Sequence, residues 1–333
     1  MSPHRHVAPI VGLGTAVVVG LLIGAATPVV GHSPGAAGEF DAVGQLPVVP
    51  LQGFVPVVTE HRYRMSAKIR PLLLFWIGKD NVGGARMRWR RGEDGAVGYD
   101  LLIGSDPARA PRQVNRWGFI LEETKGGETA ILGIMKKSDE DSLDEAKSHV
   151  SNEAKGGVVF KMIQSRNTAT ESVATVTMTQ VTRDYSYREL DALYDALVKS
   201  PGPPRHKTTA VPAGGRPGFL IGLAELLHDA VESYKRDRRA PGRKSVPYAY
   251  YGKQYDLTRA SSEVLTSATF GARTYPRLLQ SEFELRDRKA SWKEAFTIAC
   301  GIEGALTEVP VYVGYQPRWW FRADMVLDDR EVF

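Results

Sequence analysis

Short runs of alternating apolar and polar residues, joined by glycine-containing turns, constrain the fold of this chain more than any other feature. Residues 85–90 place Ala, Met and Trp on one side and three arginines on the other. That period of two is the pattern of a half-buried strand. After a Gly-containing turn at 92–95, residues 97–103 alternate again. The two runs predict a β-hairpin, and a chain of such hairpins favours an antiparallel sheet.

The same pattern recurs along the rest of the chain. Tight turns such as Lys125-Gly126-Gly127 separate the runs, and β-branched residues are common within them. Such runs are typical of strands. The further hairpins predicted are 117–123 with 129–135, 280–286 with 294–299, and 310–315 with 319–327. Further strands are predicted at 63–68, 158–163, 172–181 and 248–257.

Helical spacing of apolar residues occurs in three places, 138–153, 186–199 and 219–239. The second begins with a capping box, Ser186 and Glu189, which satisfies backbone donors at a helix start. A proline-rich stretch at 201–218 separates the second and third helices and predicts a loop. The sequence therefore predicts an α+β fold. A mainly antiparallel, curved, half-barrel-like sheet carries two to three packed helices.

The N-terminal region predicts export. Residues 7–31 carry no charge and follow Arg5, as in a signal peptide or an N-terminal membrane anchor. The predicted organisation is a leader at 1–31, a flexible Gly/Pro/Ala tether at 32–58 and an α+β body at 59–333. In both forms of the leader the body lies outside the cytoplasm, periplasmic or secreted. The single cysteine, Cys300, lies far from the leader, which excludes lipoprotein-type processing.

Two stretches of the body resemble exported half-barrel proteins of the lipoprotein-carrier type. The first runs from His61-Arg62-Tyr63-Arg64 to Gly83-Gly84-Ala85-Arg86-Met87-Arg88-Trp89, and the second is the closing strand Val309-Pro310-Val311-Tyr312 with its partner. The resemblance lies in the pattern of strands and covers about the first 60 and last 50 residues of the body. It implies a curved antiparallel sheet that cups helices and holds lipid chains, and it carries over no functional residues.

Positive side chains gather in two places. The net charge is +5 and the pI about 9.1, a mildly basic balance that favours anionic surfaces without defining a nucleic-acid-binding protein. We expect contact with anionic lipid or glycan through Arg86, Arg88 and Arg90 on one strand and through Lys235, Arg236, Arg238 and Arg239 at a helix end. Cations at a helix C-terminus are also expected from the helix dipole alone.

Aromatic residues beside arginines suggest a ligand groove. The residues concerned are Trp89, Trp117, Trp319, Trp320, Arg116 and Arg318. Indole and guanidinium groups stack on ligands, although the same residues commonly anchor a protein core.

Carboxylates on predicted strands leave an enzyme open as an alternative. Any two of them could converge as acid and base, but their alternation with apolar residues places them on the outer face of a sheet. The residues are Asp100, Glu122, Glu123, Glu282, Glu284, Asp324 and Asp328. His228 and Glu232 share one side of a helix, which we interpret as a solvated face, so no metal and no cofactor are expected.

The sequence thus predicts an exported, non-enzymatic envelope protein that binds an apolar or amphipathic, lipid-like ligand in its curved sheet. One alternative is an exported hydrolase that uses an acid pair. The other is a membrane-tethered structural or interaction domain.

Overall fold

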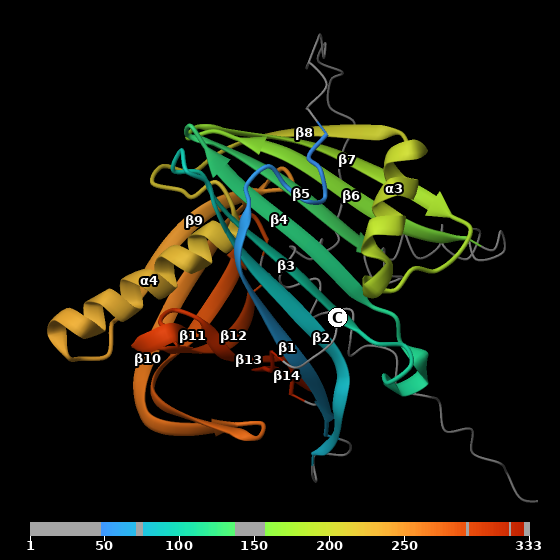
Figure 1. The fold of residues 1–333 in the computed structure, drawn as a ribbon. Helices are drawn as coiled ribbons and strands as arrows, with labels where there is room; N and C mark the ends of the chain where they lie inside the picture. The colour runs from blue at the N-terminus through green and yellow to red at the C-terminus, as the bar shows by residue number, and fades with distance from the viewer. Residues whose placement is uncertain (1–47, 71–75, 137–156, 291–292, 320, 330–333) are drawn as a thin grey trace, which may run out of the picture.

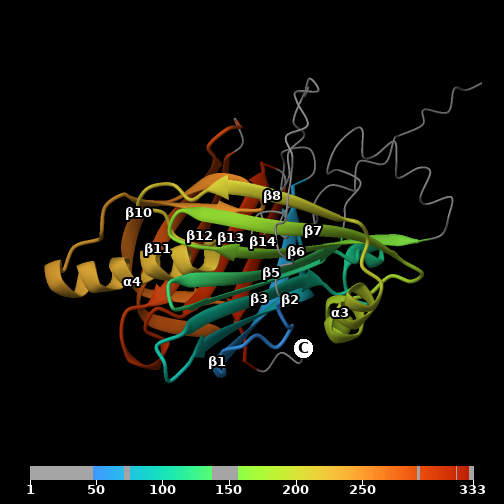
Figure 2. The ribbon, with the colours of Figure 1, turned by 90° about the horizontal axis from the view of Figure 1, so that it is seen from above.

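A computed structural model describes residues 48–70, 76–136, 157–290, 293–319 and 321–329 of the chain. Its strands form one antiparallel sheet of 14 strands, which curves into a nearly closed barrel (Figures 1 and 2). The strands are β1 (Val57–Ile69), β2 (Ile77–Arg91), β3 (Val97–Ser105), β4 (Trp117–Lys125), β5 (Glu128–Lys136), β6 (Val158–Asn167), β7 (Glu171–Val181), β8 (Pro204–Ala210), β9 (Lys244–Tyr250), β10 (Lys253–Phe270), β11 (Arg273–Asp287), β12 (Lys293–Gly301), β13 (Pro310–Arg318) and β14 (Phe321–Leu327).

The strand order follows the chain with one break. Strands β1 to β8 pair in sequence, β9 to β14 pair in sequence, and β14 pairs with β1. The two edges of the sheet are therefore β8 and β9, and they lie close together at a seam. Side chains bridge it, since Gln254 Nε2 donates to Ala210 O at 2.8 Å and Asn167 Nδ2 donates to Ala249 O at 3.2 Å. The curved antiparallel sheet predicted from the sequence is confirmed.

Two α-helices lie within the described residues, and Figures 1 and 2 show them far apart. Helix α3 (Leu190–Lys199) buries Leu190, Leu193 and Leu197 against the outer face of the β3–β6 region. Helix α4 (Phe219–Asp237) contacts β9, β10 and β3. It lies on the inner face, because its buried side chains share one core with inward-facing residues of the strands. The sheet is thus covered on both faces.

The inner face around α4 is a packed core. Phe283 and Phe296 stack with ring centroids 5.3 Å apart, and Tyr248 and Tyr255 stack at 5.2 Å. Phe219, the first residue of α4, lies 5.9 Å from Tyr248. Side chains therefore occupy the concave region beside α4, which the sequence led us to expect as ligand space.

The predicted hairpins are confirmed. Strands β2 and β3, β4 and β5, β11 and β12, and β13 and β14 each pair antiparallel. The capping box is confirmed as well, since Ser186 N donates to Glu189 Oε2 at 3.0 Å just before α3. The helix predicted at 138–153 lies outside the described residues.

The proline-rich stretch 201–218 differs from the predicted loop, because it contains strand β8. Among the described strands, β8 is an edge strand that pairs with β7, and Pro204 is its first residue. A sheet edge tolerates proline at such a position, since the missing N–H would face away from the ladder.

The N-terminal segments are described only in part. The leader at 1–31 lies outside the described residues. The predicted tether, 32–58, ends in residues that pack on the body, because Val49, Leu51 and Val55 are buried. In the part of the chain that the structure describes, no helix has the length and apolar character needed to cross a membrane.

Candidate functional site

Residues 48–56, here called the N-terminal strap, cross the outer face of the sheet before β1 begins (Figure 1). Val49 and Leu51 belong to the same apolar cluster as α3. Tyr194 in α3 donates from its hydroxyl to Val49 O at 2.8 Å. Apolar burial and a hydrogen bond therefore hold the start of the strap against α3.

Glu123 on β4 fixes the other end of the strap. Its carboxylate accepts hydrogen bonds from Phe54 N at 2.7 Å and from Val55 N at 3.1 Å. Arg90 on β2 lies 3.6 Å from Glu123 Oε1 and donates to Val55 O at 2.8 Å. A side chain from the sheet thus satisfies each of these backbone groups of the strap.

A buried ion network lies beneath this contact. Asp100 on β3 is fully buried and accepts from Arg88 Nε and Arg90 Nε, both at 2.9 Å. A buried charge is tolerated when it is paired and hydrogen-bonded. Asp100 therefore fixes the positions of two of the four arginines on β2.

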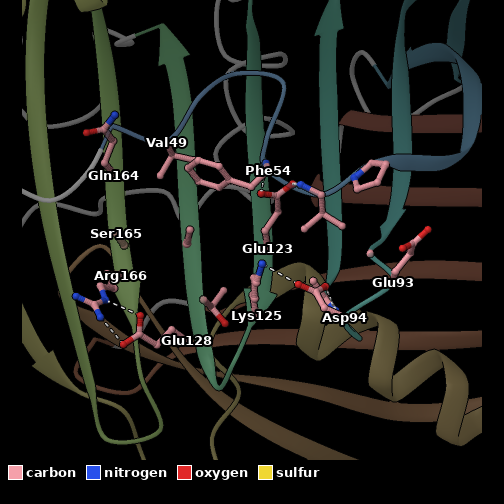
Figure 3. A pocket seen from close by; sticks show the side chains of 16 residues that line it. Val49, Phe54, Glu93, Asp94, Glu123, Lys125, Glu128, Gln164, Ser165 and Arg166 are labelled. Carbon is pink, nitrogen blue, oxygen red and sulfur yellow. Dashed lines mark hydrogen bonds and ion pairs between the residues drawn. The ribbon is translucent and has the colours of Figure 1, made fainter.

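A groove with a cavity volume of about 900 Å³ opens on the outer face beside the strap (Figure 3). Phe54 lines the groove and is 63% exposed. Val49, Val55 and Ala130 contribute further apolar walls. Ion pairs lie at its other end in Figure 3, Lys125 with Asp94 at 2.7 Å and Arg166 with Glu128. The groove is therefore apolar at one end and charged at the other.

Gln164 on β6 contributes a buried polar group to the groove wall. The residue is only 8% exposed, and its Nε2 has no hydrogen-bond partner within the described residues. A buried amide without an acceptor costs free energy. Gln164 Nε2 is therefore a donor suited to a ligand oxygen in the groove.

The ion pairs at the charged end keep their carboxylates ionised. Hydrogen bonding to Lys125 lowers the pKa of Asp94, and hydrogen bonding to Arg166 lowers the pKa of Glu128. Neither group is protonated at neutral pH, so neither is a proton donor there.

The predicted arginine stripe is found on the outer face of β2. Arg86, Arg88 and Arg90 together line a second hollow of about 370 Å³, on the other side of the strap. Arg90 is buried and Arg88 is hydrogen-bonded to Asp100. The structure brings these three residues together, and contact with an anionic surface stays a prediction.

The basic cluster at the end of α4 is exposed. Lys235 pairs with Glu232 at 2.7 Å, and Arg236 pairs with the adjacent Asp237 at 2.9 Å. Arg238 and Arg239 follow the end of the helix and are exposed. Acidic neighbours thus compensate two of the four predicted cations.

The predicted tryptophan and arginine groove residues are dispersed. Trp89 belongs to the inner core, 6.3 Å from Tyr99. Trp117 is buried in the outer core, where its indole donates to Tyr185 O at 2.7 Å. Trp319 is 55% exposed at the turn between β13 and β14, and Arg116 immediately precedes β4. Trp320 and the side chain of Arg318 lie outside the described residues.

The carboxylates require a correction, because Asp100, Glu122 and Glu123 are all buried. Glu122 faces inward and accepts from Phe219 N at 2.8 Å and Ile221 N at 3.0 Å, at the start of α4. Burial raises the pKa of Glu122 to about 7, although those backbone N–H groups oppose the shift. Glu122 and Glu123 lie on opposite faces and do not converge as an acid–base pair.

The remaining predicted acids lie on the barrel wall. Glu282 is exposed, Glu284 pairs with Lys293 at 2.6 Å, and Asp328 pairs with Arg64. Asp324 is buried and accepts from Tyr312 at 2.6 Å and Arg322 at 2.7 Å.

His228 contacts an acidic side chain, and Cys300 is buried within a strand. His228 Nδ1 lies 2.8 Å from Glu308 Oε1. Cys300 is buried in β12, and burial raises the pKa of its thiol to about 12. Among the described residues, no three His, Cys, Asp or Glu side chains are grouped so as to hold a metal ion.

Three residues of the groove, Phe54, Gln164 and Ala130, did not stand out in the sequence. Phe54 lies in a stretch that reads as a tether, and Gln164 and Ala130 sit in ordinary strand patterns. The aromatic side chain of Phe54, in a stretch rich in Gly, Pro, Ala and Val, was the one available signal.

Comparisons with known proteins identify no family for this chain. No protein-family model matches this chain, and no curated protein matches its sequence. A crystal structure described as a beta-barrel-like protein of domain of unknown function DUF1849 from Brucella abortus aligns with a TM-score of 0.37 and 7% identity. The alignment covers 83% of this chain and 96% of that chain. The lipoprotein-carrier resemblance stays a prediction.

Proposed function

We propose that this protein is an exported, non-enzymatic envelope protein that binds an apolar or amphipathic, lipid-like ligand in the groove beside the N-terminal strap. The observation that carries the proposal is the groove of about 900 Å³ beneath Phe54. This volume lies within the range of small-molecule binding sites. We propose the outer face because α4 and aromatic side chains fill the inner face around them.

The distribution of side chains supports an amphipathic ligand. An acyl chain would lie against Phe54, Val49 and Ala130, where its burial is favourable. A polar end would reach the Lys125–Asp94 and Arg166–Glu128 pairs, and Gln164 Nε2 would donate to an oxygen. Each part of the groove then contacts the matching part of the ligand.

The hydrolase alternative has less support. A general acid needs a proton near neutral pH, and the lowered pKa values of Asp94 and Glu128 keep them ionised. Glu123 lies in the groove wall, but its oxygens already accept from the strap. Binding therefore fits the groove better than hydrolysis does.

A groove-filling substitution tests the proposal. The full chain is purified, and binding of the fluorescent fatty acid cis-parinaric acid is measured by titration. Ala130→Trp should weaken binding about tenfold or more, because the indole fills the groove between Glu123 and Arg166, the neighbours of Ala130 on β4 and β6. Ala210→Trp, on the exposed end of β8, is the matched control and should bind as the unchanged protein does.

Equal binding by the two variants, or no binding by the unchanged protein, would contradict the groove proposal. Native mass spectrometry of protein purified from the envelope, with lipid extraction, identifies any ligand that co-purifies. Sequencing the N-terminus of the mature protein tests export: a start near Thr27 or Gly38 indicates release, and an intact Met1 or Ser2 indicates a tethered protein.

A further inference from the structure

The second hollow, here called the arginine pocket, has an unusual concentration of guanidinium groups. Its volume is about 370 Å³, and Arg86, Arg88 and Arg90 of β2 and Arg188 of the turn before α3 line it. Asp191 contributes an acidic side chain to the wall. Leu51 and Gln52 of the strap line this pocket, whereas Val49, Phe54, Val55 and Pro56 of the strap line the groove.

Three of the four arginines have acidic partners. Asp100 lies 2.9 Å from Arg88 Nε and 2.8 Å from Arg90 Nη2, and Glu123 lies 3.6 Å from Arg90 Nη1. Arg188 lies 3.3 Å from Asp106 and over the ring of Tyr187. Existing carboxylates therefore compensate most of the charge of these three residues.

Arg86 differs from Arg88, Arg90 and Arg188 because it forms no ion pair with a described residue. Its Nε is buried and has no hydrogen-bond partner in the described part of the chain. Burial lowers the pKa of Arg86 and the charge of Arg88 lowers it further, while Asp100, Glu60 and Asp191 oppose the shift. A desolvated guanidinium without an acceptor is costly, and its forked N–H groups match carboxylate or phosphate oxygens.

We infer that the arginine pocket binds a singly charged phosphate group, with Arg86 as its main contact. Guanidinium groups line the pocket from two elements, β2 and the turn before α3, so they can reach several oxygens of a tetrahedral anion. Arg86 forms no ion pair with a described residue and so can still pair with a ligand, while Asp191 in the wall would repel a second negative charge. Dihydrogen phosphate or a phosphodiester headgroup therefore fits better than a dianion. The inference goes beyond the groove and does not need a lipid.

Binding of two probes tests the inference on the full chain. Isothermal titration is performed at about pH 6 with inorganic phosphate, and separately with short-chain dihexanoyl phosphatidylglycerol, with chloride at matched ionic strength. Arg86→Gln should weaken phosphate binding about tenfold or more, as expected for a lost charge-assisted hydrogen bond. Arg91→Gln is the matched control, because Arg91 is an exposed residue of the same strand and does not line the pocket. This variant should bind phosphate as the unchanged protein does.

A second variant keeps the inference testable if Arg86→Gln does not fold. Asp191→Asn removes the acidic side chain from the wall, and Asp191 is exposed. It should tighten phosphate binding about threefold or more, because a repulsive charge is lost. Binding of both probes supports a headgroup site, and binding of inorganic phosphate alone supports a site for the free ion. The inference would be overturned if neither probe bound or if chloride bound as tightly as phosphate. It would also be overturned if Arg91→Gln weakened phosphate binding as much as Arg86→Gln does.

Discussion

Glu122 and Glu123 follow each other on β4, and they stabilise opposite faces of the same sheet. Glu122 faces inward and holds the first turn of α4 through the N–H groups of Phe219 and Ile221. Glu123 faces outward and holds the strap through the N–H groups of Phe54 and Val55. Both carboxylates are buried, so each face of the sheet uses one to fix the segment that covers it.

The two carboxylates differ in what balances their charge. The positive end of the α4 dipole and its free N–H groups surround Glu122, whereas Glu123 also has the guanidinium of Arg90 at 3.6 Å. At Glu122, burial outweighs the hydrogen bonds and raises the pKa to about 7. A helix start alone thus compensates a buried carboxylate incompletely. The strap contact therefore includes an ion pair, whereas the contact at the start of α4 rests on backbone N–H groups.

The largest effect is expected from removing the acid at the centre of the outer face. Asp100→Ala leaves Arg88 and Arg90 without their shared carboxylate. Breaking a buried pair in this way costs about 3 to 5 kcal/mol in the free energy of unfolding. Urea denaturation measures the loss. Asp94→Ala, which breaks an exposed pair with Lys125, is the control and should leave stability almost unchanged. A small effect of Asp100→Ala would show that the arginines do not need this partner.

The second prediction concerns pH and the inner face. The pKa of Glu122 is about 7 in the folded protein against an ordinary value of 4.5, so the folded state binds the proton more tightly than the unfolded state. This term stabilises the fold fully below pH 4.5 and is lost as the pH rises from there through 7. The loss is up to about 3 kcal/mol. Glu122→Gln should remove that slope, as measured by urea denaturation at several pH values.

Glu123→Gln is the matched control for the pH experiment, because it changes the neighbouring carboxylate on the other face. Its stability should fall between pH 4.5 and 7 as that of the unchanged protein does. If Glu122→Gln retains the slope, Glu122 is not the group responsible.

These carboxylates also show what the sequence could and could not predict. Alternation identified the strands and hairpins, because the period of two is local. It placed Glu122 and Glu123 on a solvent-facing side, since nothing local reveals a cover that arrives from elsewhere. The strap contacts Glu123 across 68 and 69 positions of the chain, and the start of α4 contacts Glu122 across 97 and 99. Burial on both faces comes from those distant segments.

A turn in the seam region is a second feature that the sequence pattern did not predict. Strand character was expected around 248–257, where the structure has a tight turn between β9 and β10 at Tyr251 and Gly252. Both residues have positive φ, 54° and 71°. Such two-residue turns usually carry Asn-Gly or Asp-Gly, and Tyr in the first position hides the signal. The arginine stripe, in contrast, was predicted correctly as one face of one strand, because its positions depend only on the alternation.

The smallest expected effect separates the two faces directly. Glu123→Gln should weaken the hold on the strap and raise the hydrogen-exchange rates of the Phe54 and Val55 amides about tenfold, a local loss of about 1.4 kcal/mol. The Phe219 and Ile221 amides should exchange as before, since Glu122 still binds them. Glu122→Gln should give the opposite pattern. Exchange measured by mass spectrometry distinguishes the outcomes: if either variant speeds exchange on both faces equally, the strap and α4 are not held independently by their own carboxylates.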